Sequence, residues 1–267
     1  MKEHPLTAST PPAQPRISLI IPVAPGDESW RALIQDLGAM ERRGRLAATG
    51  IDEILLSSDD EQLGTQLALS LQHQRHSFAE LIQVLPGGAG RAASMNRAAA
   101  SASGDYLWFV HADSRLLARH LQALQASLQQ APDALHYFNL RFDGHALMQL
   151  NAWGVWFRSH VLKTPFGDQA FCLSRSGFQA LGGYPEQAGM GEDHLLVWHA
   201  LQQDVPLQCT GATLETSARK YQQYGWLRTT SVHVYLWARQ AWPEFRQLVR
   251  QRRARRRQDN DNRERQT

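Results

Sequence analysis

The chain has 267 residues, of which 43% are hydrophobic and 20% are charged, and its formal net charge is +3. This length supports one large α/β domain, alone or with an appended helical end, and excludes a minimal scaffold. Its two cysteines, Cys172 and Cys209, form neither a C-x-x-C pair nor a disulfide framework, which favours a reducing, cytoplasmic compartment. Every uninterrupted apolar run falls short of the roughly 18 residues that span a bilayer, so any membrane contact is expected to be peripheral.

The positive charge is concentrated at one end of the chain. Arg246–Thr267 hold nine Arg against three acids, a charge of +6, so the remaining residues together carry −3. The simplest interpretation is a solvated, disordered tail. The alternative is electrostatic attachment to an anionic inner-leaflet surface, whereas the lack of aromatic residues among the final arginines argues against nucleic acid as a partner.

The chain is expected to begin as a β-α-β unit. Residues 1–15 lack the apolar core of an export signal and are rich in proline, which predicts a disordered leader. Arg16–Val23 is a continuous apolar run of the kind that is buried on both faces of a parallel sheet. Apolar residues then recur at helical spacing from Trp30 to Met40, and Ile51–Ser57 supplies a second strand.

Strands and helices continue to alternate. The next predicted elements are a helix over Asp60–Gln74, a strand at Leu81–Pro86, a helix that follows a glycine-rich turn and reaches Ser103, and a strand at Asp105–Val110. Four strands with intervening helices predict a mainly parallel sheet with right-handed crossovers. Ligands of such sheets bind beyond the carboxyl ends of the strands, and the polar motifs of this sequence lie at those ends.

The second half of the chain has an α+β pattern. Its expected elements are a helix at Leu116–Gln130, a strand at His136–Phe142, a helix at Ala146–Leu162, a strand at Gln169–Ser174, a short helix that ends at Gly182-Gly183, a helix after Gly191-Glu192-Asp193, a strand at Leu207–Thr213, and an aromatic-sided helix at Gly225–Arg257. Residues 258–267 are expected to be disordered. Because there is no internal repeat or long linker, residues 16–224 are predicted to form a single domain.

The strand at Asp105–Val110 runs directly into His111-Ala112-Asp113. A carboxylate at a strand end can hold a divalent ion that also contacts phosphates, so Asp113 is a candidate ligand for Mn²⁺ or Mg²⁺. The alternative is that Asp113 caps the helix that follows.

Other strand ends carry groups that suit a nucleotide. Pro22 closes the first strand, and Asp59 and Asp60 follow the second, where either acid can instead cap the next helix. The glycine-rich turn that includes Gly90 leads into a helix with Arg91 and Asn96. Glycines allow close backbone approach, and a helix N-terminus with an arginine favours a diphosphate; a flexible turn with a solvated arginine is the alternative.

Three later motifs complete the candidate site. Asp168 and Gln169 lie in a Gly-Asp-Gln triplet, where local sequence indicates an exposed turn at Asp168. Glu192 and Asp193 open a helix, where two acids in the first turn stabilise its N-terminus. The basic loop Arg219-Lys220 is, on its own residues, a solvated turn. The further roles of these three motifs are those that a family resemblance implies below.

Together these motifs resemble the family 2 glycosyltransferases with a GT-A fold, over roughly Arg16–Lys220. The triplet His111-Ala112-Asp113 is similar to the family's D-x-D metal motif with His in place of the first acid, a form that resembles a bacterial branch of the family. The resemblance implies a GT-A-type, Rossmann-like sheet with an α+β acceptor half. It also implies transfer of a sugar from a nucleotide-diphosphate donor to an acceptor hydroxyl, with inversion at the anomeric carbon.

The resemblance further implies a role for each motif. Asp113 would hold the metal, Asp193 would remove the proton of the acceptor hydroxyl, and Glu192 would orient the acceptor or Asp193. The residues implied to contact the nucleotide or the sugars are Pro22, Asp59, Asp60, Gly90, Arg91, Asn96, His111, Asp168, Gln169, Arg219 and Lys220. The acceptor stays open, with a lipid-linked molecule or a polysaccharide precursor as the candidates.

Two other classes of function share parts of this pattern. A sugar nucleotidyltransferase also combines a glycine-rich loop, an arginine and a metal carboxylate, but it places that loop after the first strand. In this chain that position, Val23–Asp27, has no basic residue. A non-catalytic module that binds an anionic surface or nucleic acid through the arginine-rich end is the other alternative.

Overall fold

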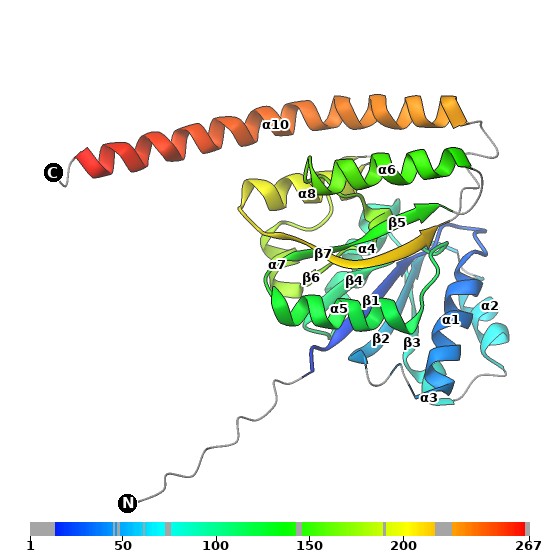
Figure 1. The fold of residues 1–267 in the computed structure, drawn as a ribbon. Helices are drawn as coiled ribbons and strands as arrows, with labels where there is room; N and C mark the ends of the chain where they lie inside the picture. The colour runs from blue at the N-terminus through cyan, green and yellow to red at the C-terminus, as the bar shows by residue number, and fades with distance from the viewer. Residues whose placement is uncertain are drawn as a thin grey trace, which may run out of the picture.

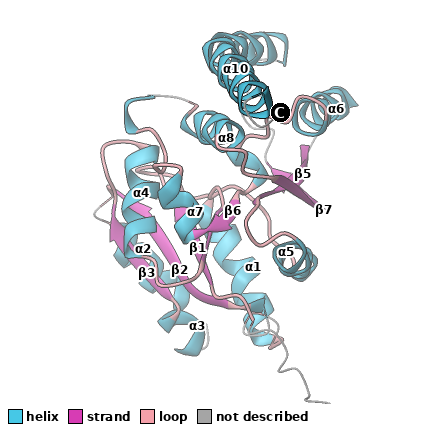
Figure 2. Ribbon diagram, turned by 90° about the vertical axis from the view of Figure 1, so that its left-hand side faces the viewer, coloured by secondary structure: helices cyan, strands magenta, loops and turns pink. Residues whose placement is uncertain are grey.

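The computed structural model describes residues 14–44, 46, 49–60, 62–72, 76–142, 146–188, 191–216 and 226–264. Most of the predicted leader, residues 1–13, lies outside this set, as do Arg219 and Lys220. Within it, a seven-stranded sheet has the order β3-β2-β1-β4-β6-β5-β7 and is flanked by helices (Figures 1 and 2).

The first half forms the predicted parallel sheet. Its strands are β1 (Ile17–Pro22), β2 (Ile51–Ser58), β3 (Ile82–Pro86) and β4 (Tyr106–Phe109). β1 pairs in parallel with both β2 and β4, and β2 pairs in parallel with β3. The expected β-α-β alternation is therefore confirmed, and the carboxyl ends of these four strands share one edge of the sheet.

Side chains of successive strand residues feed two separate cores. Leu19 and Ile21 pack in one apolar cluster with helix α1 (Trp30–Arg42), while Ile20 packs in another with helix α4 (Arg91–Ser101). This alternation follows from the two-residue repeat of a strand. The segment predicted as one helix over Asp60–Gln74 contains α2 (Leu63–Leu71), and a separate short helix α3 (His76–Glu80) follows it.

The second half extends the same sheet. Its strands are β5 (Leu135–Phe142), β6 (Cys172–Ser174) and β7 (Leu207–Thr216), and its helices are α5 (Ala118–Gln130), α6 (Ala146–His160), α7 (Arg175–Ala180) and α8 (Glu192–Gln202). β6 is antiparallel to both β4 and β5, so it joins the two halves. The strand predicted from Gln169 starts at Cys172, because Gly167–Gln169 form a 3-10 turn that the Gln169 side chain closes by accepting the N–H of Phe166.

The last helix, α10 (Trp226–Glu264), crosses the top of the molecule in Figure 1. It packs on α8 through a small apolar cluster of Trp198, Ala241 and Leu248. The helix continues beyond Arg257, so the expectation of disorder from residue 258 is wrong for 258–264. After Pro243 the sequence has neither glycine nor proline to end the helix. No helix in the described part of the chain is long and apolar enough to cross a membrane.

Candidate active site

The Asp193 carboxylate is held in a fixed position at the start of α8. Its Oδ2 atom accepts the backbone N–H of Gly167 at 2.6 Å, and its Oδ1 atom accepts the N–H of His194 at 2.9 Å. A Cβ atom on Gly167 would lie 2.7 Å from Asp193 Oδ2, so any larger residue would displace the carboxylate. The turn before β6 and the N-terminus of α8 therefore meet through this glycine.

Arg91 connects three elements of the site. Its Nε atom donates to the carboxylate of Glu192, in an ion pair between the first residues of α4 and α8. Its Nη1 atom lies 3.5 Å from Nε2 of His111, which follows β4. Two helix N-termini and the end of a strand thus converge on one guanidinium group, which makes this edge favourable for anions.

Electrostatics keep Asp193 charged. Burial alone would raise its pKa, but the positive charge of Arg91 and the hydrogen bond from Gly167 outweigh burial, so its pKa lies below the usual value. The pKa of Arg91 is raised, because the nearby carboxylates of Asp193 and Glu192 outweigh the effect of its burial. The base candidate is therefore ionised at neutral pH beside a permanent cation.

Asp168 has the opposite character. Burial, reinforced by the negative charges of Asp193 and Asp113 and opposed by Arg158, raises its pKa to about 6. Its Oδ1 atom is buried and has no hydrogen-bond partner among the described residues. A carboxylate with one buried oxygen that accepts no hydrogen bond, close to two other acids, is a position where a cation would relieve repulsion.

The donor set fits a divalent metal only in part. No group of three or more His, Cys, Asp or Glu side chains within the described ranges is arranged to hold a metal ion. However, Mg²⁺ in phosphate-binding sites is commonly held by one or two carboxylates, with phosphate oxygens and water completing its coordination. Asp113 and Asp168 are two such carboxylates, so the site fits a metal that binds together with a diphosphate.

Two residues predicted to line the site instead support it. The side-chain oxygen of buried Gln169 accepts from Ser159 Oγ at 2.8 Å, and its amide nitrogen donates to the carbonyl of Phe138 at 2.8 Å. The amide of Asn96 is used in the same way, donating to the carbonyl of Tyr184 at 2.8 Å and accepting its N–H at 2.9 Å. Because these hydrogen bonds occupy both amides, direct contact with a nucleotide is not supported for either.

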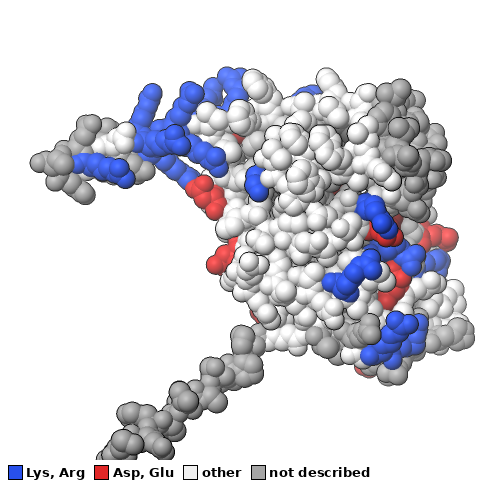
Figure 3. All heavy atoms as spheres, in the orientation of Figure 1, with Lys and Arg blue, Asp and Glu red and all other residues white. Residues whose placement is uncertain are grey.

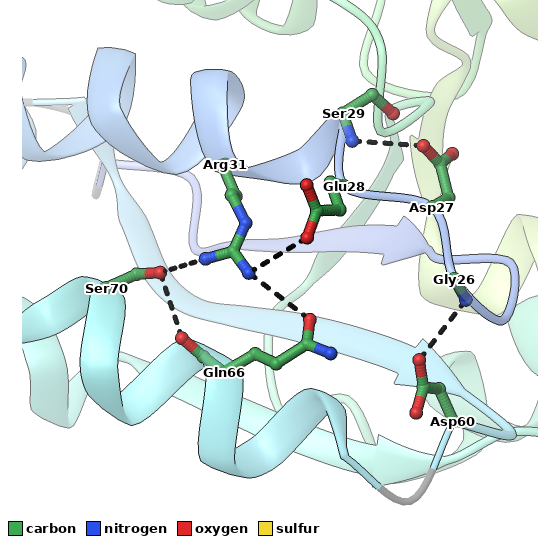
Figure 4. A network of polar contacts seen from close by, with 8 residues as sticks. All are labelled: Gly26, Asp27, Glu28, Ser29, Arg31, Asp60, Gln66 and Ser70. Carbon is green, nitrogen blue, oxygen red and sulfur yellow. Dashed lines mark hydrogen bonds and ion pairs between the residues drawn. The ribbon is translucent and has the colours of Figure 1, made fainter.

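Asp59 and Asp60 follow β2, and the sequence left each of them as either a nucleotide contact or a helix cap. The structure distinguishes the two. Asp60 is used locally, because its carboxylate accepts the N–H of Gln62 at 2.9 Å. It also accepts the N–H of Gly26 at 3.2 Å, which Figure 4 shows. Asp59 is exposed and lies against the glycine-rich turn, where a Cβ on Gly87 would come within 2.7 Å of its Oδ1 atom. Asp59 therefore stays the better candidate for a nucleotide contact.

Two further predicted residues, Pro22 and Gly90, lie at the same edge. Pro22 ends β1 opposite Ser57 of β2, and Gly90 precedes α4 with a φ of +96°. A backbone with this φ strongly favours glycine. Gly90 therefore lets the glycine-rich turn lead directly into Arg91. Arg219 and Lys220 lie outside the described residues.

Sequence reasoning missed two residues of the site. Gly167 belongs to a motif that we interpreted only through Asp168, and the demand for a glycine comes from Asp193, 26 positions later. Arg158 lies on α6 in an aromatic-rich stretch without a motif, and its guanidinium carbon is 3.4 Å from the ring centroid of Phe166. It supplies positive charge near Asp168, and no local sequence signal marks it.

Comparison with known proteins shows which class of fold this is. Several solved structures share the fold: Staphylococcus aureus TarS 1–349 (TM-score 0.54, 15% identity, 76% of this chain and 60% of that chain), the mannosyltransferase PcManGT from Pyrobaculum calidifontis in complex with GDP-Man and Mn²⁺ (0.54, 14%, 78% and 58%), and GalNAc-T7 with UDP, GalNAc and Mn²⁺ (0.56, 16%, 77% and 44%). This chain thus spans 60% or less of the length of each of these chains. No curated protein matches the sequence.

The fold is therefore that of the GT-A glycosyltransferases. Residues 47–159 of the chain match the model of glycosyl transferase family 2. The matched stretch runs from before β2 into α6, so it contains Asp59, Arg91 and Asp113 but ends before Asp193. The special His-Ala-Asp form of the metal motif stays a prediction.

Proposed function

We propose that the protein transfers a sugar from a nucleoside-diphosphate sugar to an acceptor hydroxyl, with a divalent cation and with inversion at the anomeric carbon. The observation that carries this proposal is the fixed, ionised carboxylate of Asp193 beside the Arg91 guanidinium, at the strand edge that also bears Asp113. A general base next to a cationic cradle is what direct displacement of a diphosphate requires.

In the proposed reaction, the acceptor oxygen attacks the anomeric carbon while the bond from that carbon to the diphosphate oxygen breaks. Asp193 accepts the hydroxyl proton. Because its pKa is lowered, the proton transfers as formation of the new C–O bond makes the hydroxyl more acidic. Arg91 contributes positive potential where the diphosphate develops charge, and Glu192 fixes Arg91 through their ion pair.

Asp113, with Asp168 beside it, would hold Mn²⁺ or Mg²⁺. The ion would neutralise charge on the departing diphosphate. The structural relatives that carry Mn²⁺ in their names also carry GDP-Man or UDP, which supports a nucleotide-linked donor for this chain but leaves its base open. A sugar nucleotidyltransferase is less well supported, because the loop after β1 contacts the acid Asp60 through Gly26 and has no basic residue.

Calorimetric titration with UDP and GDP, with and without Mn²⁺, tests the proposal. We expect Mn²⁺-dependent binding of one nucleotide, weakened at least about tenfold by Asp113→Asn, which removes a charged ligand. Asp105→Asn is the matched control, because Asp105 is an exposed acid that precedes the same strand at its opposite end. Binding of neither nucleotide, or binding that ignores both Mn²⁺ and Asp113, would contradict the proposal.

A further inference from the structure

One face of helix α10 packs against the rest of the protein. Ala241 and Leu248 are buried against α8, Glu244 accepts the side-chain N–H of Gln202 at 2.8 Å, and Arg255 pairs with Asp204. These positions are three or four residues apart, or a multiple of such steps, which places them on one side of a helix with 3.6 residues per turn. This side is occupied by contacts within the chain.

The opposite side of α10 carries a second regular set of residues, which we name the outer stripe. Its members are all exposed and follow one another at intervals of three or four positions: Tyr235, Arg239, Trp242, Arg246, Arg250, Arg253 and Arg257. Tyr235 and Trp242 are each 63% exposed. A shallow hollow on the helix is lined by Arg250, Arg253 and Arg257, together with Ala254 and Gln258.

Helix α6 exposes an apolar face at the same end of the molecule. Leu150, Trp153 and Phe157 lie on one side of α6 and are 54%, 61% and 38% exposed, and the rings of Trp153 and Phe157 stack at 5.8 Å. Figures 1 and 2 both show α6 and α10 together at this end. In Figure 3 much of the upper surface bears neither Lys, Arg, Asp nor Glu, and basic side chains crowd the C-terminal part of α10.

We propose that the outer stripe and the apolar face of α6 form a docking surface for an anionic lipid bilayer. Exposed Trp and Tyr side chains suit the headgroup level of a membrane, and aligned guanidinium groups suit its phosphates. Charge favours a bilayer over a second copy of the chain as the occupant of this surface. The stripe presents five arginines and no acid, so it attracts an anionic surface and would repel the same stripe on another copy.

Docking would place the candidate active site beside the membrane. A Cβ atom built on Gly191, which directly precedes Glu192 and Asp193, would meet the side chain of Gln240 on the inner side of α10. The N-terminus of α8 therefore lies under the helix. This consequence rests on the proposed function and favours an acceptor that is itself lipid-linked. The docking surface itself does not depend on the transfer reaction.

Flotation of the full chain with vesicles tests the proposal. Vesicles of phosphatidylcholine with about one third phosphatidylglycerol should bind the protein at physiological salt, and pure phosphatidylcholine vesicles should bind it far more weakly. The pair Arg253→Gln/Arg257→Gln, from the outer stripe, should weaken binding about 30-fold, at about fivefold per arginine near an anionic surface. The matched pair Arg252→Gln/Arg256→Gln removes the same charge at the same spacing outside the stripe and should weaken binding about threefold or less.

Each result decides the question. Equal losses for the two pairs would indicate unoriented attraction of a charged tail and would overturn the docking surface, as would failure of the wild type to bind anionic vesicles. Sedimentation that reveals a dimer abolished by Trp242→Ser, without vesicle binding, would assign the surface to a second copy instead. Helix content by circular dichroism and nucleotide binding by calorimetry should stay unchanged in both pairs, which separates failure of this proposal from failure of the proposed function.

Discussion

Replacing Gly167 by alanine tests how the Asp193 carboxylate is held. The added Cβ would lie 2.7 Å from Asp193 Oδ2 and 2.9 Å from its Cβ, so the side chain must move and lose the 2.6 Å hydrogen bond from the Gly167 N–H. A hydrogen bond to a charged group contributes about 1.5–3 kcal/mol, which corresponds to a rate loss of about 10- to 150-fold if the misplaced carboxylate cannot reach the acceptor.

The assay is hydrolysis of sugar nucleotides that carry the base identified by calorimetry, with water as acceptor, followed by release of the nucleoside diphosphate. Asp193→Asn sets the rate without the base. Gly154→Ala is the matched control, because Gly154 lies within α6 and an added Cβ there meets nothing within 4 Å. In the wild type, the hydrogen bond from Gly167 lowers the pKa of Asp193. Its loss in Gly167→Ala should raise that pKa, so the acid limb of the pH profile should move to higher pH. A Gly167→Ala rate within twofold of wild type would refute the reasoning.

Two further variants separate the chemistry from its support. In the folded protein Asp168 has its pKa raised to about 6, so folding favours its protonated form, and its charge destabilises the fold increasingly as pH rises from about 4 to 6. Asp168→Asn should therefore stabilise the metal-free protein at pH 7 by on the order of 1–2 kcal/mol in urea unfolding, while it weakens Mn²⁺-dependent nucleotide binding. The control is Asp133→Asn, because Asp133 is exposed. Destabilisation by Asp168→Asn would contradict the assignment. Asn96→Ala breaks the hydrogen bonds to Tyr184 and should cost about 1–3 kcal/mol of stability while changing nucleotide affinity less than about twofold; a large loss of affinity at unchanged stability would return Asn96 to the binding site.

The apolar pattern by itself determined the first half of the fold. Runs such as Arg16–Val23 and Ile51–Ser57 are short, continuous and separated by helical periodicity, which is a local signal for buried parallel strands. Because strand ends of a parallel sheet share one edge, the same pattern also predicts that Asp59, Arg91 and Asp113 lie at that edge. α10 extends beyond Arg257, contrary to the predicted disorder, because this charged segment lacks residues that end a helix.

Only the tertiary structure decided what each polar side chain does. Asn96 and Gln169 lie within motifs, but their side chains donate hydrogen bonds to the carbonyls of Tyr184 and Phe138. Arg91 is fixed by Glu192, which lies 101 positions away. The pKa values of Asp168 and Asp193 diverge although both acids lie in the same site, because Arg91 and a backbone N–H favour the charge of Asp193 while burial beside other acids opposes that of Asp168. Residue type and local pattern therefore predict which groups reach the strand edge, whereas hydrogen-bond partners and electrostatic neighbours come from distant segments and exist only once the chain has folded.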